Sequence, residues 1–264
     1  ILASESVGLA DAADNGSSLM MPPEKRKMFL LYARRPAFVY RVKLAQERIT
    51  EWLSLAKNPY IAFSTGKDST CILDLVRTQA KETPAVYFDA NCAYPESETL
   101  LAEIENLIQF PTDEPLLDSL ARLGLRTPLD DTMETLVYRP AKRLIARYRF
   151  DGMCYGLRAE ENEGRRKHAQ SHGAVFYLKR DGVTACQPIH DWTYNDVWAY
   201  IVTRNLAYCG VYDKLWDLPI DDQRVCYWAC TVKRRYGRLS WLKQHYPELF
   251  NRFVARLPEI RDYV

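Results

Sequence analysis

The feature that most constrains the fold of this sequence is an alternation of short apolar runs and helical patterns between residues 58 and 156. Tyr60 to Phe63 and Ala85 to Phe88 are two such runs, and each precedes a segment with apolar residues at helical spacing. Weaker runs at 107–110 and 153–156 continue the pattern. This alternation predicts an α/β fold with a mainly parallel, twisted sheet and helices on both faces.

The rest of the chain lacks this alternation, so the sequence predicts four parts. They are a flexible N-terminal arm, N-terminal helices, an α/β domain and a small C-terminal helical extension, over residues 1–22, 23–57, 58–205 and 206–264. Pro36 interrupts the N-terminal helical pattern and predicts two helices or one broken helix. Within the α/β domain we expect a hairpin around Asp181-Gly182, a polar loop from Arg158 to Gly173, and a helix that starts at a capping box of Thr193 and Asp196.

Composition excludes several classes of protein. The longest apolar runs, at 28–33 and 197–202, fall far short of the roughly 18 residues of a membrane span. The first twenty residues do not resemble a secretory signal, and seven cysteines, an odd number, suit a reducing compartment. We therefore expect a cytoplasmic protein without a membrane partner. A formal net charge of +2 is too small for a general polyelectrolyte binder.

The segment Ser64-Thr65-Gly66-Lys67-Asp68-Ser69 joins the first apolar run to the next helix. A helix N-terminus presents free N–H groups and the positive end of its dipole, so this loop predicts an anion site suited to phosphate. Gly66 allows close approach, Lys67 adds a charge, and Asp68 is a candidate Mg²⁺ ligand. A plain helix cap is the alternative, but Lys67 and Asp68 have no packing role in such a loop. The Walker A spacing is absent, which excludes a P-loop NTPase.

This loop resembles the PP-loop of the adenine nucleotide alpha-hydrolase (HUP-like) superfamily, and Lys before Asp resembles its phosphoadenosine phosphosulfate (PAPS) reductase branch. Two later segments strengthen the resemblance, which covers residues 58–215. The first is Gly156-Leu157-Arg158-Ala159-Glu160-Glu161, with Arg165 and Arg166 after it. The second is Pro188-Ile189, Asp191-Trp192-Thr193 and Asp196-Val197-Trp198.

The resemblance implies an adenine nucleotide at the carboxyl ends of the first strands. It implies a nucleoside beside Ala62, Phe63 and residues 88–91, which include Asp89. It implies phosphates held by the loop from Ser64 to Ser69, with Gly156, Arg158 and Arg165 or Arg166 at the α-phosphate. The implied catalytic residues are Lys67, Asp68 and Arg158, and the implied ligands are ATP and Mg²⁺. Independently, Asp89 is equally well explained as the cap of the next helix, and Glu160 and Glu161 as a solvated turn.

The chain departs from PAPS reductases because no cysteine follows Cys230. The cysteine spacings that hold the iron–sulfur cluster of adenylyl sulfate reductases are also absent. The stretch from Arg224 to Val232 instead resembles a Cys-Trp-x-Cys-Thr segment in the ATP pyrophosphatase subunits of DNA phosphorothioation systems, with one extra residue between the cysteines. This resemblance implies cleavage of ATP to AMP and pyrophosphate to activate DNA for sulfur incorporation. The implied partners are DNA, a cysteine desulfurase or other sulfur carrier, and sibling modification proteins. The alternatives are a PAPS or adenylyl sulfate reductase, and a nucleotide-binding subunit without turnover.

Several further groups carry two interpretations each. Cys186, Cys209, Cys226 and Cys230 match the ligand number of a [4Fe–4S] cluster, or are buried thiols. Two basic runs are candidate nucleic-acid surfaces, or else solvated helix faces. The first comprises Arg139, Lys142, Arg143, Arg147 and Arg149, and the second comprises Lys233, Arg234, Arg235 and Arg238. His168 and His172 are metal or phosphate ligands, or plain loop histidines. Trp192 and Trp198 are expected in the core rather than stacked on bases.

Overall fold

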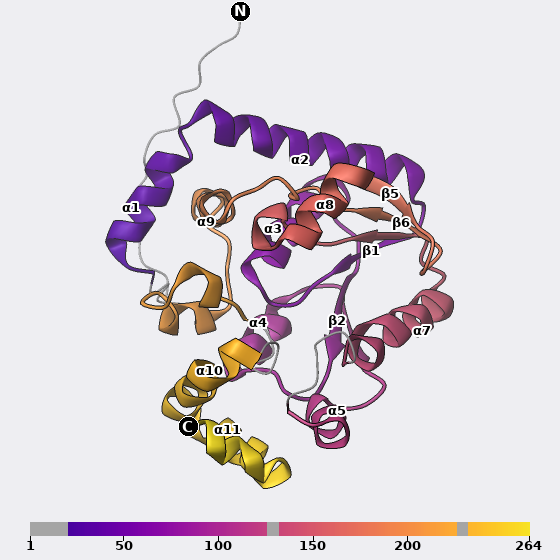
Figure 1. Ribbon diagram of the computed structural model, residues 1–264. Coiled ribbons are helices and arrows are strands. Elements are labelled where there is room, and N and C mark those ends of the chain that lie inside the picture. The colour runs from indigo at the N-terminus through magenta and orange to yellow at the C-terminus, as the bar shows by residue number, and fades with distance from the viewer. Residues whose placement is uncertain (1–20, 126–131, 226–231) are drawn as a thin grey trace, which may run out of the picture.

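The computed structural model describes residues 21–125, 132–225 and 232–264, and the side chains of 232–237 are not described. At its centre lies a six-stranded sheet in the order β3-β2-β1-β4-β6-β5 (Figure 1). All neighbouring strands are parallel except β5 and β6, which form the predicted hairpin. The strands are β1 (Pro59–Ala62), β2 (Ala85–Asp89), β3 (Leu107–Pro111), β4 (Gly152–Cys154), β5 (Val175–Leu178) and β6 (Val183–Cys186). The predicted α/β fold with a mainly parallel sheet is confirmed.

Helices alternate with the strands and close both faces of the sheet (Figure 1). The helices up to β4 are α1 (Pro23–Tyr32), α2 (Pro36–Leu55), α3 (Lys67–Gln79), α4 (Pro95–Glu103), α5 (Leu116–Leu123), a π-helical turn η1 (Glu134–Tyr138) and α7 (Arg139–Tyr148). Those after β4 are η2 (Ala159–Glu161), α8 (Glu163–His172), α9 (Tyr194–Thr203), η3 (Gly210–Lys214), η4 (Ile220–Asp222), α10 (Val232–His245), α11 (Pro247–Arg256) and η5 (Pro258–Tyr263). None of the helices in the described ranges is long and apolar enough to cross a bilayer.

The two faces of the sheet bury separate apolar clusters because successive strand residues point to opposite sides. Ile61 and Tyr87 belong to the larger cluster, together with residues of α2, α3 and α9. Tyr60 and Val86, one position earlier, belong to a smaller cluster that also includes Leu144 of α7. The chain therefore crosses to the other face between β3 and β4.

This crossing places a topological switch point between β1 and β4, where the strand order reverses. The connections from β1 to β3 run outward in one direction, whereas the chain returns past β1 to form β4. Ligands of open α/β sheets bind outside the carboxyl ends of the strands at such a point. The segment after β1 and the segment after β4 meet there.

The predicted loop from Arg158 to Gly173 is wrong, because residues 163–172 form α8. Asn162 caps this helix by accepting the N–H of Arg165 at 2.8 Å. No residue of α8 is buried, so the helix has no apolar stripe that periodicity could reveal. His168 and His172 consequently stack on a helix, with ring centroids 4.4 Å apart.

Other local predictions are confirmed. Pro36 begins α2, after a turn that follows α1. Gly182 has a φ of +71° in the turn of the β5–β6 hairpin. Thr193 and Asp196 form the capping box of α9. Trp192 and Trp198 are buried in the core.

Candidate functional site

The loop after β1 wraps around the N-terminus of α3. Thr65 has a φ of +58°, and this left-handed residue turns the chain so that α3 begins at Lys67. The N–H of Ser64 donates to Oγ of Ser69 at 3.2 Å, and that hydroxyl donates to the carbonyl oxygen of Gly66 at 2.9 Å. These hydrogen bonds fix the loop against the first turn of α3, where the helix dipole favours an anion.

Three charged side chains converge beside this loop: two are buried cations and the third is a half-buried carboxylate. Nζ of Lys67 donates to Oδ2 of Asp68 at 2.9 Å, and Nε of Arg158 donates to Oδ1 at 2.5 Å. The side chains of Lys67 and Arg158 are only 4% and 5% exposed. Burial raises the pKa of Asp68, but the charges and hydrogen bonds of Lys67 and Arg158 outweigh it and hold the pKa below its usual value. Asp68 is therefore an anion that orients two cations.

Gly156 explains how Arg158 reaches this group from β4. A Cβ atom on Gly156 would lie 3.0 Å from the carbonyl carbon and oxygen of Asp68. A side chain at this position would press on the backbone of the first turn of α3, so glycine favours the close approach of the chain after β4. Glu160 then pairs with Arg158 and accepts the N–H of Tyr194 at 2.7 Å, which links the group to α9.

A further arginine, which the sequence interpretation did not assign to the site, enters from the C-terminal part. Glu161 pairs with Arg165 and, at 3.3 Å, with Nη1 of Arg224. Burial and the nearby cations Arg224 and Arg158 lower the pKa of Arg165. The neighbouring Arg166 is exposed, so of the two predicted arginines the structure places Arg165 at the site. The one sequence feature that points to Arg224 is its position at the start of the cysteine-containing stretch from Arg224 to Val232.

Tyr212 is a second residue at this site that the sequence does not predict. Its hydroxyl accepts the backbone N–H of Lys67 at 2.9 Å, and the ammonium group of Lys67 lies 5.9 Å from the centre of its ring. Tyr212 lies on η3, far from the loop in sequence. No spacing rule connects it to the loop after β1, so only the folded chain reveals it.

The predicted nucleoside residues occupy different environments. Ala62 is partly buried at the end of β1, whereas Phe63 is buried in the larger apolar cluster. Asp89 is exposed at the end of β2 and accepts the N–H of Asn91 at 2.8 Å. It does not cap α4, whose N-cap is Tyr94. Asp89 thus remains accessible at the carboxyl edge of the sheet.

Neither predicted metal site is brought together among the residues that the structure describes. Both oxygens of Asp68 are engaged by cations, which is unfavourable for Mg²⁺. Cys186 lies near the carbonyl of Arg48, and Cys209 contacts Ser97 instead. In the described part of the chain, no three His, Cys, Asp or Glu side chains lie together in a way that could hold a metal ion. Cys226 and Cys230 lie outside the described residues.

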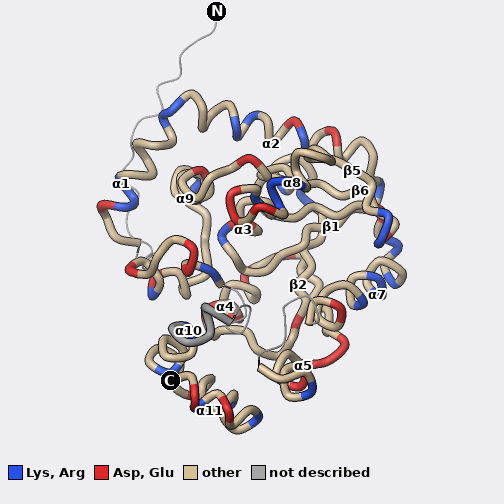
Figure 2. Tube along the Cα trace, viewed as in Figure 1, with Lys and Arg blue, Asp and Glu red and all other residues tan. Residues whose placement is uncertain are grey.

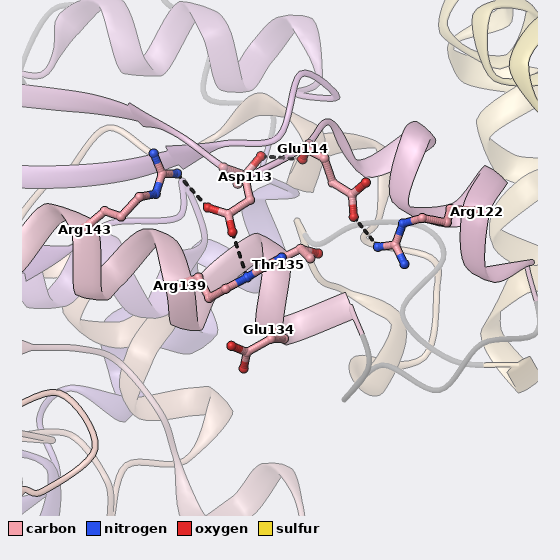
Figure 3. A pocket seen from close by; sticks show the side chains of 8 residues that line it. Asp113, Glu114, Arg122, Glu134, Thr135, Arg139 and Arg143 are labelled. Atoms are coloured by element: carbon pink, nitrogen blue, oxygen red, sulfur yellow. Dashed lines mark hydrogen bonds and ion pairs between the residues drawn. The ribbon is translucent and has the colours of Figure 1, made fainter.

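A polar cavity of about 820 Å³ lies beyond the end of β3 (Figure 3). Asp113 bridges Arg139 and Arg143 there, at 2.8 Å each, and Glu114 pairs with Arg122 at 2.5 Å. These cations are already neutralised by carboxylates. Three arginines and three carboxylates line the cavity, so its charges balance and do not favour a phosphate.

The predicted basic surfaces are only partly present. Lys142, Arg147 and Arg149 are exposed on or just after α7, where Figure 2 shows a concentration of basic residues. Arg238 of the second cluster is instead buried, and its Nη2 donates to the carbonyl of Arg224 at 2.6 Å. The side chains of Lys233, Arg234 and Arg235 lie outside the described part.

Known proteins resemble the chain over its α/β part. The family model of the phosphoadenosine phosphosulfate reductase domain matches residues 58–218, more than half of the chain. A phosphoadenosine 5′-phosphosulfate reductase of Gloeobacter violaceus is 27% identical over 166 residues, 58% of this chain and 65% of the relative. The match thus spans slightly less than two thirds of that relative. An adenosine 5′-phosphosulfate reductase of Oceanobacillus iheyensis is 24% identical over 203 residues, 67% of this chain and 79% of the relative.

Solved structures show the same fold. The PAPS reductase of Candida auris, in a phosphate complex, has a TM-score of 0.52 at 16% identity and covers 73% of this chain and 92% of its own. The FMN adenylyltransferase of Candida glabrata, in complex with FAD and inorganic pyrophosphate, has a TM-score of 0.52 at 12% identity and covers 72% and 65%. These likenesses place the sheet in the HUP fold.

Proposed function

Since the chain belongs to the phosphoadenosine phosphosulfate reductase domain family, we propose that it binds an adenosine nucleotide and breaks the anhydride at its 5′-phosphate. Reduction of a sulfonucleotide, PAPS or adenylyl sulfate, is the leading reaction. The family match and the relatives named as reductases support it. The observation that carries the proposal is the group of Lys67, Asp68 and Arg158 at the N-terminus of α3.

Charge development explains what these residues contribute. In sulfonucleotide reduction a thiolate attacks the sulfur, the S–O bond breaks, and the electron pair leaves with the nucleotide phosphate. A second thiol then releases sulfite and leaves a disulfide. Negative charge grows on the leaving phosphate, and fixed cations that are already desolvated stabilise it at little reorganisation cost. Asp68 orients Lys67 and Arg158 toward that position, and Glu160 fixes Arg158 from the other side.

The second candidate is cleavage of ATP to AMP and pyrophosphate. It is favoured by the described cysteines, namely Cys71, Cys92, Cys154, Cys186 and Cys209, which are all buried. Burial raises the pKa of Cys71, Cys154 and Cys209, which makes them poor nucleophiles. In this reaction an acceptor oxygen attacks the α-phosphorus, and pyrophosphate leaves into the loop after β1. The acceptor then carries the adenylate, and AMP leaves when a sulfur nucleophile or water attacks the adenylated acceptor.

For this second reaction we propose DNA as the acceptor, with a cysteine desulfurase or other sulfur carrier and sibling modification proteins as partners. The exposed Lys142, Arg147 and Arg149 support a polyanionic acceptor. Stimulation of pyrophosphate release by duplex DNA, lost at high salt, is the expected result. Release that is indifferent to DNA would remove this acceptor.

The decisive experiment offers adenylyl sulfate, PAPS and ATP separately, each with a thiol reductant. Sulfite release establishes the reductase, whereas AMP with pyrophosphate establishes the second candidate. Lys67→Ala is expected to abolish either activity, and the exposed Lys43→Ala serves as the matched control. Nucleotide binding without product indicates a binding subunit, and no binding overturns the proposal.

The undescribed thiols are tested in the same assay. Cys226 lies two residues after Arg224, which pairs with Glu161 at the site. Cys226→Ser and Cys230→Ser are therefore the first variants to test. Loss of sulfite release in either variant identifies the nucleophile of the reductase. Iron and sulfide analysis of the same preparations tests the predicted [4Fe–4S] cluster.

A further inference from the structure

The hydroxyl of Tyr212 lies directly over the loop that precedes α3. It accepts the N–H of Lys67 at 2.9 Å. A Cβ atom built on Gly66 would lie 3.7 Å from the same hydroxyl. The phenol oxygen is therefore within hydrogen-bonding range of the backbone that would surround a bound anion.

The ring that carries this hydroxyl is fixed by the core. Tyr212 is 2% exposed, and its ring meets Trp198 edge-on with centroids 5.1 Å apart. Tyr208 packs on it at 6.4 Å. An aromatic side chain held in this way cannot move aside without breaking the contact between η3 and α9. The hydroxyl stays in place when a ligand enters.

The hydroxyl also retains a proton to donate. Burial and the charge of Asp68 raise the pKa of Tyr212 far above its usual value, so the phenol stays protonated. Its oxygen accepts the N–H groups of Lys67 and Val225. Across the described ranges, no acceptor for the phenol proton itself is seen. A donor is thus held ready beside a loop that is suited to anions.

We propose that Tyr212 is a ligand-binding residue of this site, whose hydroxyl donates to an oxygen of the phosphate or sulfate group held by the loop. This inference rests on the proposed nucleotide site. It assigns a donor to η3, a segment outside the three motifs that define the site. It also makes ligand binding depend on the segment from Tyr212 to Val225, because the same hydroxyl accepts an N–H from each side.

The test measures the Kd of inorganic pyrophosphate by calorimetry for wild type, Tyr212→Phe, Tyr208→Phe and Lys67→Ala. Tyr208→Phe is the matched control, because its hydroxyl donates to Asp213 at 2.7 Å within the same aromatic cluster. A hydrogen bond to a charged group corresponds to roughly tenfold or more in affinity. We expect the Kd to rise at least about tenfold in Tyr212→Phe and to change less than about twofold in Tyr208→Phe.

The outcomes separate this inference from the proposed function. Wild-type affinity in Tyr212→Phe, together with loss in Lys67→Ala, overturns the role of Tyr212 and leaves the nucleotide site standing. No pyrophosphate binding by the wild type overturns the role of Tyr212, whereas the proposed function is decided by the experiment with the three nucleotides. Thermal unfolding of each variant shows whether the fold is retained. If Tyr212→Phe fails to fold, 3-fluorotyrosine at position 212 replaces it, and its stronger hydroxyl donor is expected to tighten binding, with unchanged affinity refuting the role.

Discussion

Replacing Asp68 with asparagine tests the central electrostatic group of the site. The change removes the charge that faces two buried cations, Lys67 and Arg158, while keeping the shape of the side chain. Removing one partner of a buried ion pair costs about 3 to 5 kcal/mol, because the other charge stays uncompensated. Because Glu160 still pairs with Arg158, we expect the free energy of unfolding to fall by the lower value of this range, about 3 kcal/mol.

The pH dependence of folding stability provides a second, independent test of the same prediction. Because the pKa of Asp68 is lowered in the folded state, its stabilisation is present above its unfolded pKa of about 3.9 and is lost as pH falls through the folded value. The wild type should therefore lose this contribution below about pH 4. The free energy of unfolding of Asp68→Asn should depend less on pH in the acid range than that of the wild type, since an amide does not titrate.

Urea unfolding followed by tryptophan fluorescence, in buffers without phosphate, measures both effects. Asp118→Asn is the control, because Asp118 pairs with Arg256 at the surface, where both side chains are about half exposed. It should change stability by no more than about 1 kcal/mol. Pyrophosphate should stabilise Asp68→Asn more than wild type, because the anion replaces the missing charge. A loss below about 1 kcal/mol at pH 7 would refute the interpretation of Asp68 as the charge that holds the two cations.

Three further changes test the surroundings of the site. Gly156→Ala should destabilise the fold by about 2 kcal/mol in urea unfolding, because its Cβ would meet the carbonyl of Asp68; wild-type stability would contradict the close approach. Arg165→Ala should raise the Kd of a nucleotide about tenfold in calorimetry, whereas the adjacent, exposed Arg166→Ala should not; equal effects would remove the distinction. Trp52→Phe should cost about 2 kcal/mol, because the carbonyl of Thr184 loses the indole donor at 2.9 Å; a neutral result would show that another donor replaces it.

The sequence predicts the central sheet well because its strands are short apolar runs that end at sharp turns. The segment from Tyr60 to Ser69 carries a strand, a turn and a helix start within ten residues, so local rules suffice. The same rules miss α8, since a helix with no buried residue has no hydrophobic period. They also do not distinguish η1 from α7, because a π-helical turn has the composition of an ordinary helix.

The site is predictable only where its residues lie within motifs. Lys67, Asp68 and Arg158 stand in two motifs, and the parallel pairing of β1 with β4 brings these together. Tyr212 and Arg224 reach the site from the C-terminal part through tertiary packing. No local spacing encodes that contact, so their contributions appear only in the folded chain.

The insertion of β4 beside β1 also has a consequence for synthesis of the chain. Asp68 and Arg158 are 90 residues apart in sequence, so the ribosome completes the PP-loop long before it makes the arginine. At translation rates of 5–20 residues per second, this delay lasts roughly 5 to 18 s. During that time β1, β2 and β3 can pair, but the β1 edge that later accepts β4 stays open. The nascent chain thus exposes an unpaired strand edge beside an unfinished charge group, which makes this interval the stage at which a chaperone or a bound nucleotide has the most to protect.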